Sequence, residues 1–169
     1  HQGATSVFVP WIRPGALFLH ISSASVLGKS KDHALGNRTT PNPRTFPSAA
    51  YALAKLEADQ YLQEEATERG FRLMFLRPAV VYSPQGAGMV GTVLKLAKRG
   101  ISLKLYPRTA RHHFCDMNLL VEVATRVIER NDLLPDRSSF VVADPYTVTN
   151  RQLDDIIQRS KPLQKGQHL

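Results

Sequence analysis

Three polar side chains, Ser23, Tyr51 and Lys55, have the types and the spacing needed to move a proton to and from a substrate hydroxyl. Tyr51 and Lys55 are four residues apart, so on a helix they share one face about one turn from each other. A tyrosine acts as a general base at neutral pH only if its pKa falls from about 10 toward 7, which takes roughly 4 kcal/mol of phenolate stabilisation. A neighbouring ammonium provides part of that stabilisation because an opposite charge favours the phenolate.

The four-residue spacing alone does not indicate catalysis, because it is also typical of a surface tyrosine that packs on a lysine stem. The surrounding elements decide between the two interpretations. The apolar run 17–21 predicts a buried strand that ends at Ser23. Open α/β sheets bind ligands at the carboxyl ends of their strands, so Ser23 is placed to hold a substrate hydroxyl against the tyrosine. Helix formers then predict a long helix that opens at Pro47–Ser48, runs to Arg69 and stops at Gly70.

The rest of the chain continues the alternation of strands and helices. We expect strands at 71–76 and 140–142, and helices near 89–99, 117–130 and 150–159, the last capped by Thr149. Residues 1–14 are poorly patterned, 28–47 predict an irregular loop, 78–88 another loop, and 101–115 an extended, irregular stretch. The pattern indicates an α/β protein with a mainly parallel sheet. Only about three strands are convincing, so a doubly wound sheet would be short by half.

Several segments together resemble a known family. Residues 21–28, 48–59 and 76–84 (ISSASVLG, SAAYALAKLEAD and LRPAVVYSP) are similar to three segments of extended short-chain dehydrogenases/reductases: a strand end, the catalytic helix and an Arg-Pro strand end. Residues 111–119, 140–144 and 147–156 match later elements in order. The resemblance covers about residues 16–159, within the NAD-dependent epimerase/dehydratase family, and is strongest to sugar-nucleotide 4-epimerases. In place of an Asn that contacts substrate in 4-epimerases, this chain has Val80.

The resemblance implies a fold and a division of the chain. We expect a partial Rossmann-type, doubly wound parallel sheet that lacks its N-terminal cofactor-binding half. Residues 1–85 would be the C-terminal half of an NAD(P)-binding domain, 86–160 a substrate-binding part and 161–169 a polar, frayed tail. The chain begins at His1 rather than Met, which adds to the expectation of a fragment that is inactive alone.

Roles for single residues also follow from the resemblance. Tyr51 would be the catalytic base and acid, Lys55 would tune it and hold the nicotinamide ribose, and Ser23 would orient the substrate hydroxyl. The remaining predicted cofactor contacts are Ser22, Pro78, Val80 and Val81. The remaining predicted substrate contacts are Ala24 and Arg111. The implied reaction oxidises a hydroxyl of a nucleotide sugar by hydride transfer to NAD, with NADP as an alternative cofactor. A homodimer formed through the Tyr-Lys helix is implied as well.

The cofactor's usual binding motif is missing from the expected place. Residues 1–22 contain no glycine-rich turn, and the G-x-G-x-x-G at 86–91 neither follows its strand directly nor has an acidic residue about 20 positions on. We interpret 86–91 as a glycine loop that feeds a helix N-terminus, which could help bind the substrate diphosphate. We therefore expect the chain as given not to bind NAD tightly.

Composition and charge narrow the kinds of ligand and site that we expect in this chain. The formal net charge is +8, but the basic residues are scattered, which favours a solvated surface or an anionic small ligand over nucleic acid. No apolar run reaches the roughly 18 residues of a membrane span. One cysteine, Cys115, cannot form an internal disulfide, which fits a cytoplasmic setting, and we interpret it as a packing residue. Adjacent His112 and His113 would point to opposite faces of an extended chain, so we expect no metal site.

Two other functions stay open. One is a different enzyme on the same frame, such as a 3-hydroxysteroid-type dehydrogenase or a carbonyl reductase. The other is a truncated remnant or binding module that keeps Ser23, Tyr51 and Lys55 but performs no catalysis. Replacement of Tyr51 by Phe distinguishes an enzyme from a binding module, because it should abolish turnover in the enzyme and change nothing in the binding module.

Overall fold

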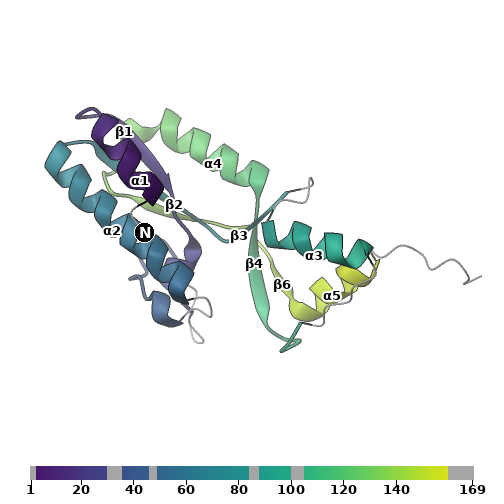
Figure 1. Ribbon diagram of the computed structural model, residues 1–169. Helices are drawn as coiled ribbons and strands as arrows, with labels where there is room; N and C mark the ends of the chain where they lie inside the picture. The colour runs from purple at the N-terminus through teal and green to yellow at the C-terminus, as the bar shows by residue number, and fades with distance from the viewer. Residues whose placement is uncertain (1–2, 30–35, 46–48, 84–87, 100–104, 160–169) are drawn as a thin grey trace, which may run out of the picture. The chain divides into compact units, whose positions relative to one another are not determined.

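The computed structural model describes residues 3–29, 36–45, 49–83, 88–99 and 105–159, which form two compact units (Figure 1). Unit 1 comprises residues 1–79 and 120–142, and unit 2 comprises residues 80–119 and 143–169. The chain therefore passes from unit 1 to unit 2, returns to unit 1, and enters unit 2 again at residue 143. The two units are defined by which residues pack together. The predicted boundary at residue 85 instead separates a cofactor-binding segment from a substrate-binding segment, and it stays a prediction.

Unit 1 is built on a parallel sheet with the strand order β1-β2-β5, where β1 is Leu17–Ile21, β2 is Arg72–Pro78 and β5 is Ser139–Val142. These are the three strands predicted from the apolar runs. β2 lies in the centre and is buried along its whole length after Arg72, as expected for a parallel strand covered on both faces. Because all three strands run in the same direction, their carboxyl ends meet at one edge.

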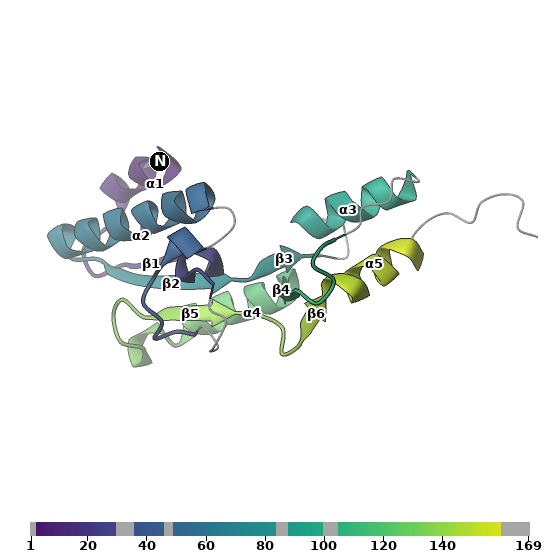
Figure 2. The ribbon, with the colours of Figure 1, turned by 90° about the horizontal axis from the view of Figure 1, so that it is seen from below.

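Helices cover both faces of this sheet. Figure 2 shows α1 (Gly3–Phe8) and α2 (Ala49–Arg69) on one side and α4 (Met117–Glu129) on the other. The hydrophobic core under α2 joins Leu62 and Ala66 of the helix to alternate side chains of β2 and to Val9. The core residues are Val9, Leu62, Ala66, Phe71, Leu73 and Phe75. Residues 1–14, which are poorly patterned in the sequence, contain α1 and a 3-10 turn at Val9–Trp11.

Gly70 ends α2, as predicted. Its φ of +70° is the left-handed conformation that glycine adopts at little cost, and its N–H donates to the Ala66 carbonyl. The Gly70 carbonyl then accepts from the N–H of Gly15, which lies just before β1. The end of α2 is thus tied to the start of the first strand.

Unit 2 contains a mixed sheet with the order β3-β4-β6, in which β3 (Val80–Tyr82) is parallel to β4 (Arg111–Asp116) and β6 (Thr147–Thr149) is antiparallel to it. The sequence predicted none of these as strands: 80–82 was assigned to a loop and 111–115 to an extended, irregular stretch. Three residues are too few for a periodic pattern to show, so pairing with β4 defines β3 and β6.

Two helices complete unit 2, α3 (Gly88–Lys98) and α5 (Asn150–Arg159), both close to their predicted ranges. Thr149 caps α5 as predicted: its hydroxyl oxygen accepts from the Gln152 N–H, and the Gln152 side chain accepts from the Thr149 N–H. This reciprocal pair is a capping box, which satisfies backbone donors at the helix start. The glycine loop 86–91 lies partly, and the tail 161–169 wholly, outside the described residues.

Candidate functional site

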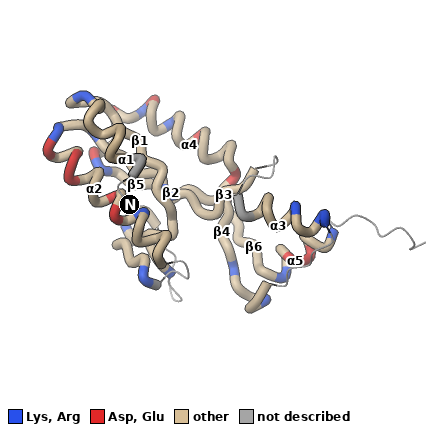
Figure 3. Tube along the Cα trace, in the orientation of Figure 1, with Lys and Arg blue, Asp and Glu red and all other residues tan. Residues whose placement is uncertain are grey.

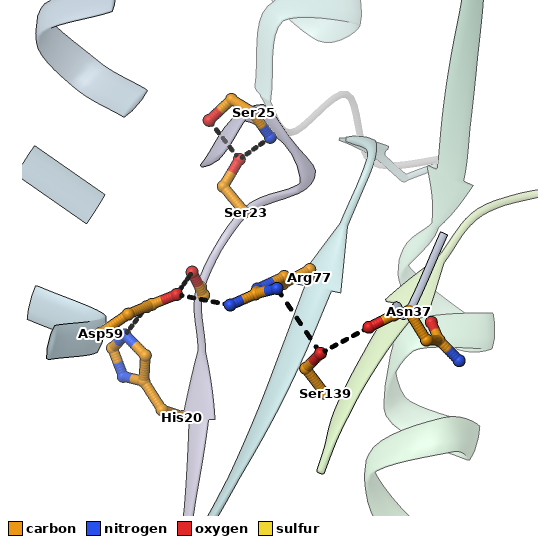
Figure 4. Close-up of polar contacts among 8 residues, drawn as sticks. His20, Ser23, Ser25, Asn37, Asp59, Arg77 and Ser139 are labelled. Atoms are coloured by element: carbon orange, nitrogen blue, oxygen red, sulfur yellow. Dashed lines mark hydrogen bonds and ion pairs between the residues drawn. The ribbon is translucent and has the colours of Figure 1, made fainter. Parts of the chain in front are cut away.

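Ser23 is the second residue after β1, at the edge where the carboxyl ends of the unit 1 strands meet. It is the N-cap of a 3-10 turn, Ala24–Leu27, and its hydroxyl oxygen accepts from the Ser25 N–H at 3.2 Å and from the Ser25 hydroxyl at 2.9 Å (Figure 4). A hydroxyl has two acceptor lone pairs and one donor. Ser25 therefore uses both acceptor positions and leaves the Ser23 O–H to donate to another group.

Tyr51 and Lys55 lie in the first two turns of α2, on one face as their spacing predicts. The Lys55 ammonium donates to the carbonyl of Ile21, the last residue of β1, at 3.3 Å. The Tyr51 side chain is 53% exposed, so its hydroxyl is accessible to a ligand from solution. The structure thus brings Lys55 to the strand end that carries Ser23, with Tyr51 one turn away on the same helical face.

A buried polar cluster lies one turn further along α2 and joins three elements (Figure 4). The Asp59 carboxylate, which is fully buried, accepts from the Ser22 hydroxyl at 3.0 Å and from the Arg77 guanidinium at 3.3 Å. His20 Nε2 lies 3.5 Å from the other carboxylate oxygen. We call Asp59, Ser22, Arg77 and His20 the Asp59 cluster.

Strand alternation explains how the cluster forms. His20 and Ser22 are two residues apart on β1 and its extension, and Phe75 and Arg77 are two apart on β2, so all four point to one face. His20 is also paired with Phe75 in the register of the two strands, and their rings meet edge to face. α2 covers this face and places Asp59 over it.

Burial governs protonation in the cluster. It lowers the pKa of His20 from 6.5 to about 4, with the Lys55 charge adding to the effect, so the imidazole is neutral at neutral pH. Burial raises the pKa of the Asp59 carboxyl, while the Ser22 hydrogen bond and the Arg77 charge oppose the rise. A buried carboxylate is stable only with such partners.

Asp59 and Arg77 lie in two of the segments that resemble the family, 48–59 and 76–84, but the sequence predicted no role for either residue. A signal was present, because Arg77 directly follows the apolar run 73–76, where a charge is costly without a partner. Asp59 is also four residues after Lys55, on the helix face that turns toward the sheet.

The other predicted contacts fall in both units. In unit 1, Ser22 is buried with its hydroxyl engaged by Asp59, Pro78 is buried at the end of β2, and Ala24 is half-buried in the 3-10 turn. In unit 2, Val80 and Val81 are half-buried in β3, and Arg111 is exposed at the start of β4. Their roles toward cofactor and substrate stay predictions.

Cys115 is buried in β4, as expected of a packing residue, and burial together with the nearby Asp144 and Asp116 carboxylates raises its pKa to about 11. Within the described ranges, no group of three or more His, Cys, Asp or Glu residues could hold a metal ion. Likewise, no described helix combines the length and the apolar character needed to cross a membrane.

Comparison with known proteins gives the family. Residues 3–143, which make up most of the chain, match the model of the NAD dependent epimerase/dehydratase family. The chain belongs to this family. The expectation drawn from residues 21–28, 48–59 and 76–84 is therefore confirmed at family level.

Individual relatives of this epimerase/dehydratase family member agree. A UDP-glucose 4-epimerase of Vibrio cholerae is 25% identical over 137 residues, which are 80% of this chain and 40% of the relative. A dTDP-glucose 4,6-dehydratase of Streptomyces venezuelae has a similar structure with a TM-score of 0.74 at 15% identity, covering 94% of this chain and 47% of that one. A UDP-glucose 4-epimerase of Thermus thermophilus in complex with NAD gives a TM-score of 0.66 at 16% identity, covering 85% and 48%.

These similarities confirm the fold class predicted from the sequence, an α/β fold with a parallel sheet of the Rossmann type. The chain spans less than half the length of each of these relatives.

The ribose end of NAD requires hydrogen-bond donors. The Lys55 ammonium has three N–H donors and, among the described residues, uses one on Ile21, so two suit a pair of ribose hydroxyls and the predicted role of Lys55 stays a prediction. The pyrophosphate end requires a glycine-rich turn between a strand and a helix, and residues 1–22 contain none.

Proposed function

We propose that this chain carries the acid–base residues and a substrate-binding part of an NAD-dependent enzyme that oxidises a hydroxyl of a nucleotide sugar. The observation that carries the proposal is the Lys55 contact with Ile21, because it brings the Tyr-Lys face of α2 to the strand end that bears Ser23. Membership of the epimerase/dehydratase family supports the same reaction class.

In the proposed mechanism, Lys55 and Tyr51 would hold the nicotinamide-ribose end of NAD, which would supply the hydride acceptor for the sugar carbon. The Ser23 O–H, left free to donate by its two bonds from Ser25, holds the substrate oxygen. Tyr51 removes the proton from that hydroxyl and returns it when the carbonyl is reduced or rearranged. Lys55 holds the cofactor ribose and contributes a positive charge on the same helical face.

The proposed substrate class, a nucleotide sugar, rests on the positive charge of one segment of the chain. Six Lys and Arg residues and no Asp or Glu lie between Gly91 and Cys115 in the sequence. Figure 3 shows Lys and Arg on α3 and on the strand that follows it. Such a surplus attracts an anionic ligand such as a nucleotide diphosphate, and we propose that Arg111 contacts it. A steroid or a neutral carbonyl substrate would gain nothing from this charge.

The test uses the longest in-frame product of the coding region around this chain, with NAD and either UDP-glucose or dTDP-glucose. Tyr51→Phe should lower kcat by roughly 10²–10⁴-fold with KM changed only a few-fold, since it removes the proton-transferring group but not the ring. Tyr61→Phe is the matched control, because Tyr61 lies on the same helix and packs against the hydrophobic core.

Turnover that survives Tyr51→Phe would contradict the assigned role of Tyr51. A wild-type product that binds no nucleotide and turns over neither sugar would overturn the proposal in favour of a non-catalytic remnant.

A further inference from the structure

The segment that carries Ser23 is held to α2 at two neighbouring points. Lys55 donates to the carbonyl of Ile21, and one turn later Asp59 accepts from the hydroxyl of Ser22. Ser23 is the next residue along the chain. Two consecutive residues just before Ser23 are therefore fixed by two side chains that lie four apart on one helix.

The Asp59 carboxylate is also fixed from a third direction. Arg77, which is 6% exposed, donates to the same carboxylate oxygen that accepts from Ser22, and its other terminal nitrogen lies 3.5 Å from the hydroxyl of Ser139 on β5. Figure 4 shows the line of contacts from His20 through Asp59 and Arg77 to Ser139 and Asn37. The cluster thus connects α2, the end of β1, β2 and β5.

We propose that Asp59 is a positioning residue for the reaction: through Ser22 it sets the place of Ser23 relative to the Tyr-Lys face of α2. This inference rests on the proposed function for its effect on turnover. A hydrogen bond to a buried carboxylate is stronger than one between neutral groups, so the Ser22 bond restrains the strand end more than a surface contact would.

A cluster kept only for stability would behave differently. Replacing a buried ion pair by apolar residues of similar volume is often neutral or stabilising, whereas removing one partner leaves an unpaired buried charge. The double change Asp59→Leu with Arg77→Met therefore separates the two roles, because it removes the tie to Ser22 without leaving a charge behind. Ser22→Ala is a second, smaller change that keeps the Asp59–Arg77 pair intact.

Ser139→Ala is the matched control for Ser22→Ala. Ser139 also contributes a hydroxyl to the network, through Arg77, but it is half-buried, lies on β5 and does not contact the β1 end. Both changes delete one hydroxyl from a serine of the same network, so a general loosening of the network affects both in the same way.

The first measurement is amide hydrogen exchange in the chain as given, at Ser25 and Val26, whose N–H groups donate to the side chain and the carbonyl of Ser23. Exchange at both should speed up at least about 10-fold in Ser22→Ala and in the double variant, and less than about 2-fold in Ser139→Ala. The second measurement is turnover by the longest in-frame product. We expect kcat to fall about 10-fold or more in Ser22→Ala and in the double variant, with KM within about 3-fold, and neither to change in Ser139→Ala.

The outcomes separate the positioning role from the proposed function. Unchanged exchange at Ser25 and Val26 in either Ser22→Ala or the double variant overturns the positioning role, as does an equal effect of Ser139→Ala. If the wild type shows no turnover, the proposed function fails, while the exchange rates still decide whether Asp59 places Ser23.

Discussion

His20 is a titratable residue with several partners among the described residues. It lies between Phe18 and Phe75, next to the Asp59 carboxylate and within the electrostatic reach of Lys55. Protonation would add a third positive charge to those of Lys55 and Arg77, with only the Asp59 carboxylate of the cluster to balance them. The Asp59 cluster therefore favours a neutral imidazole.

The low pKa of His20 predicts a pH dependence of stability. The pKa is 6.5 in the unfolded chain and about 4 in the folded one, so between these values the unfolded state binds more protons. The free energy of unfolding should then fall as the pH is lowered from about 6.5 to about 4, and His20→Gln should remove that part of the slope. Urea unfolding of both proteins across this range measures it.

The comparison isolates His20 because Asp59, whose raised pKa acts with the opposite sign, is present in both proteins. Above pH 7 the two stability curves should run parallel. Equal slopes in the two proteins between pH 4 and 6.5 would contradict the assignment of a neutral, buried His20.

Among the elements, α2 has the largest part in the site, since it carries Tyr51, Lys55 and Asp59 within its first three turns. Its far end is anchored by Leu62 and Ala66 in the core and by the Gly70 turn. A helix held firmly at its carboxyl end presents its amino-terminal turns in a constant place. The stop at Gly70 is therefore part of how the site is positioned.

Gly70→Ala tests this stop. A Cβ at Gly70 would meet nothing closer than 4.0 Å, so the cost arises from the left-handed φ and should be about 1 kcal/mol of unfolding free energy. Gly36→Ala is the control, because a Cβ there also meets nothing within 4 Å and its φ lies outside the left-handed region. Thermal or urea unfolding of both variants gives the difference, and an equal loss in the two would contradict the conformational explanation.

At the scale of the whole chain, the proposed site accounts for one end of a dinucleotide, whereas residues 1–22 contain no glycine-rich turn for the other end. In that proposal Lys55 and Tyr51 hold the nicotinamide-ribose end, while the pyrophosphate end of a Rossmann site normally gains its affinity from backbone N–H groups of a glycine-rich turn. Because residues 1–22 contain no such turn, the affinity of this chain for NAD should be low.

We therefore expect the chain as given to bind NADH more weakly than the micromolar range. Fluorescence titration of NADH against the chain measures this, with Lys55→Ala as the control for binding at the ribose site. Micromolar affinity that Lys55→Ala weakens would show that the residues present are sufficient for the cofactor and would refute the expectation.

Local sequence signals were enough for the elements that are long or strongly punctuated. The apolar runs at 17–21 and 71–76 became parallel strands, Gly70 ended α2 and Thr149 capped α5, because propensity, periodicity and capping act within a few residues. The four-residue spacing of Tyr51 and Lys55 likewise placed both on one helical face. The short strands β3 and β6 could not be predicted, because their partners are distant in sequence.

The sequence by itself therefore determined the α/β class, the family and the candidate catalytic residues. Only the tertiary structure decided that Lys55 reaches Ile21, that Ser23 is left as a donor, and that Asp59 joins Ser22 to Arg77. Each of these contacts crosses between elements that are 18 to 37 residues apart or depends on how a turn folds back on itself. The physical reason is that a buried charge needs a partner, and the packing of α2 on the sheet chooses which partners come within reach.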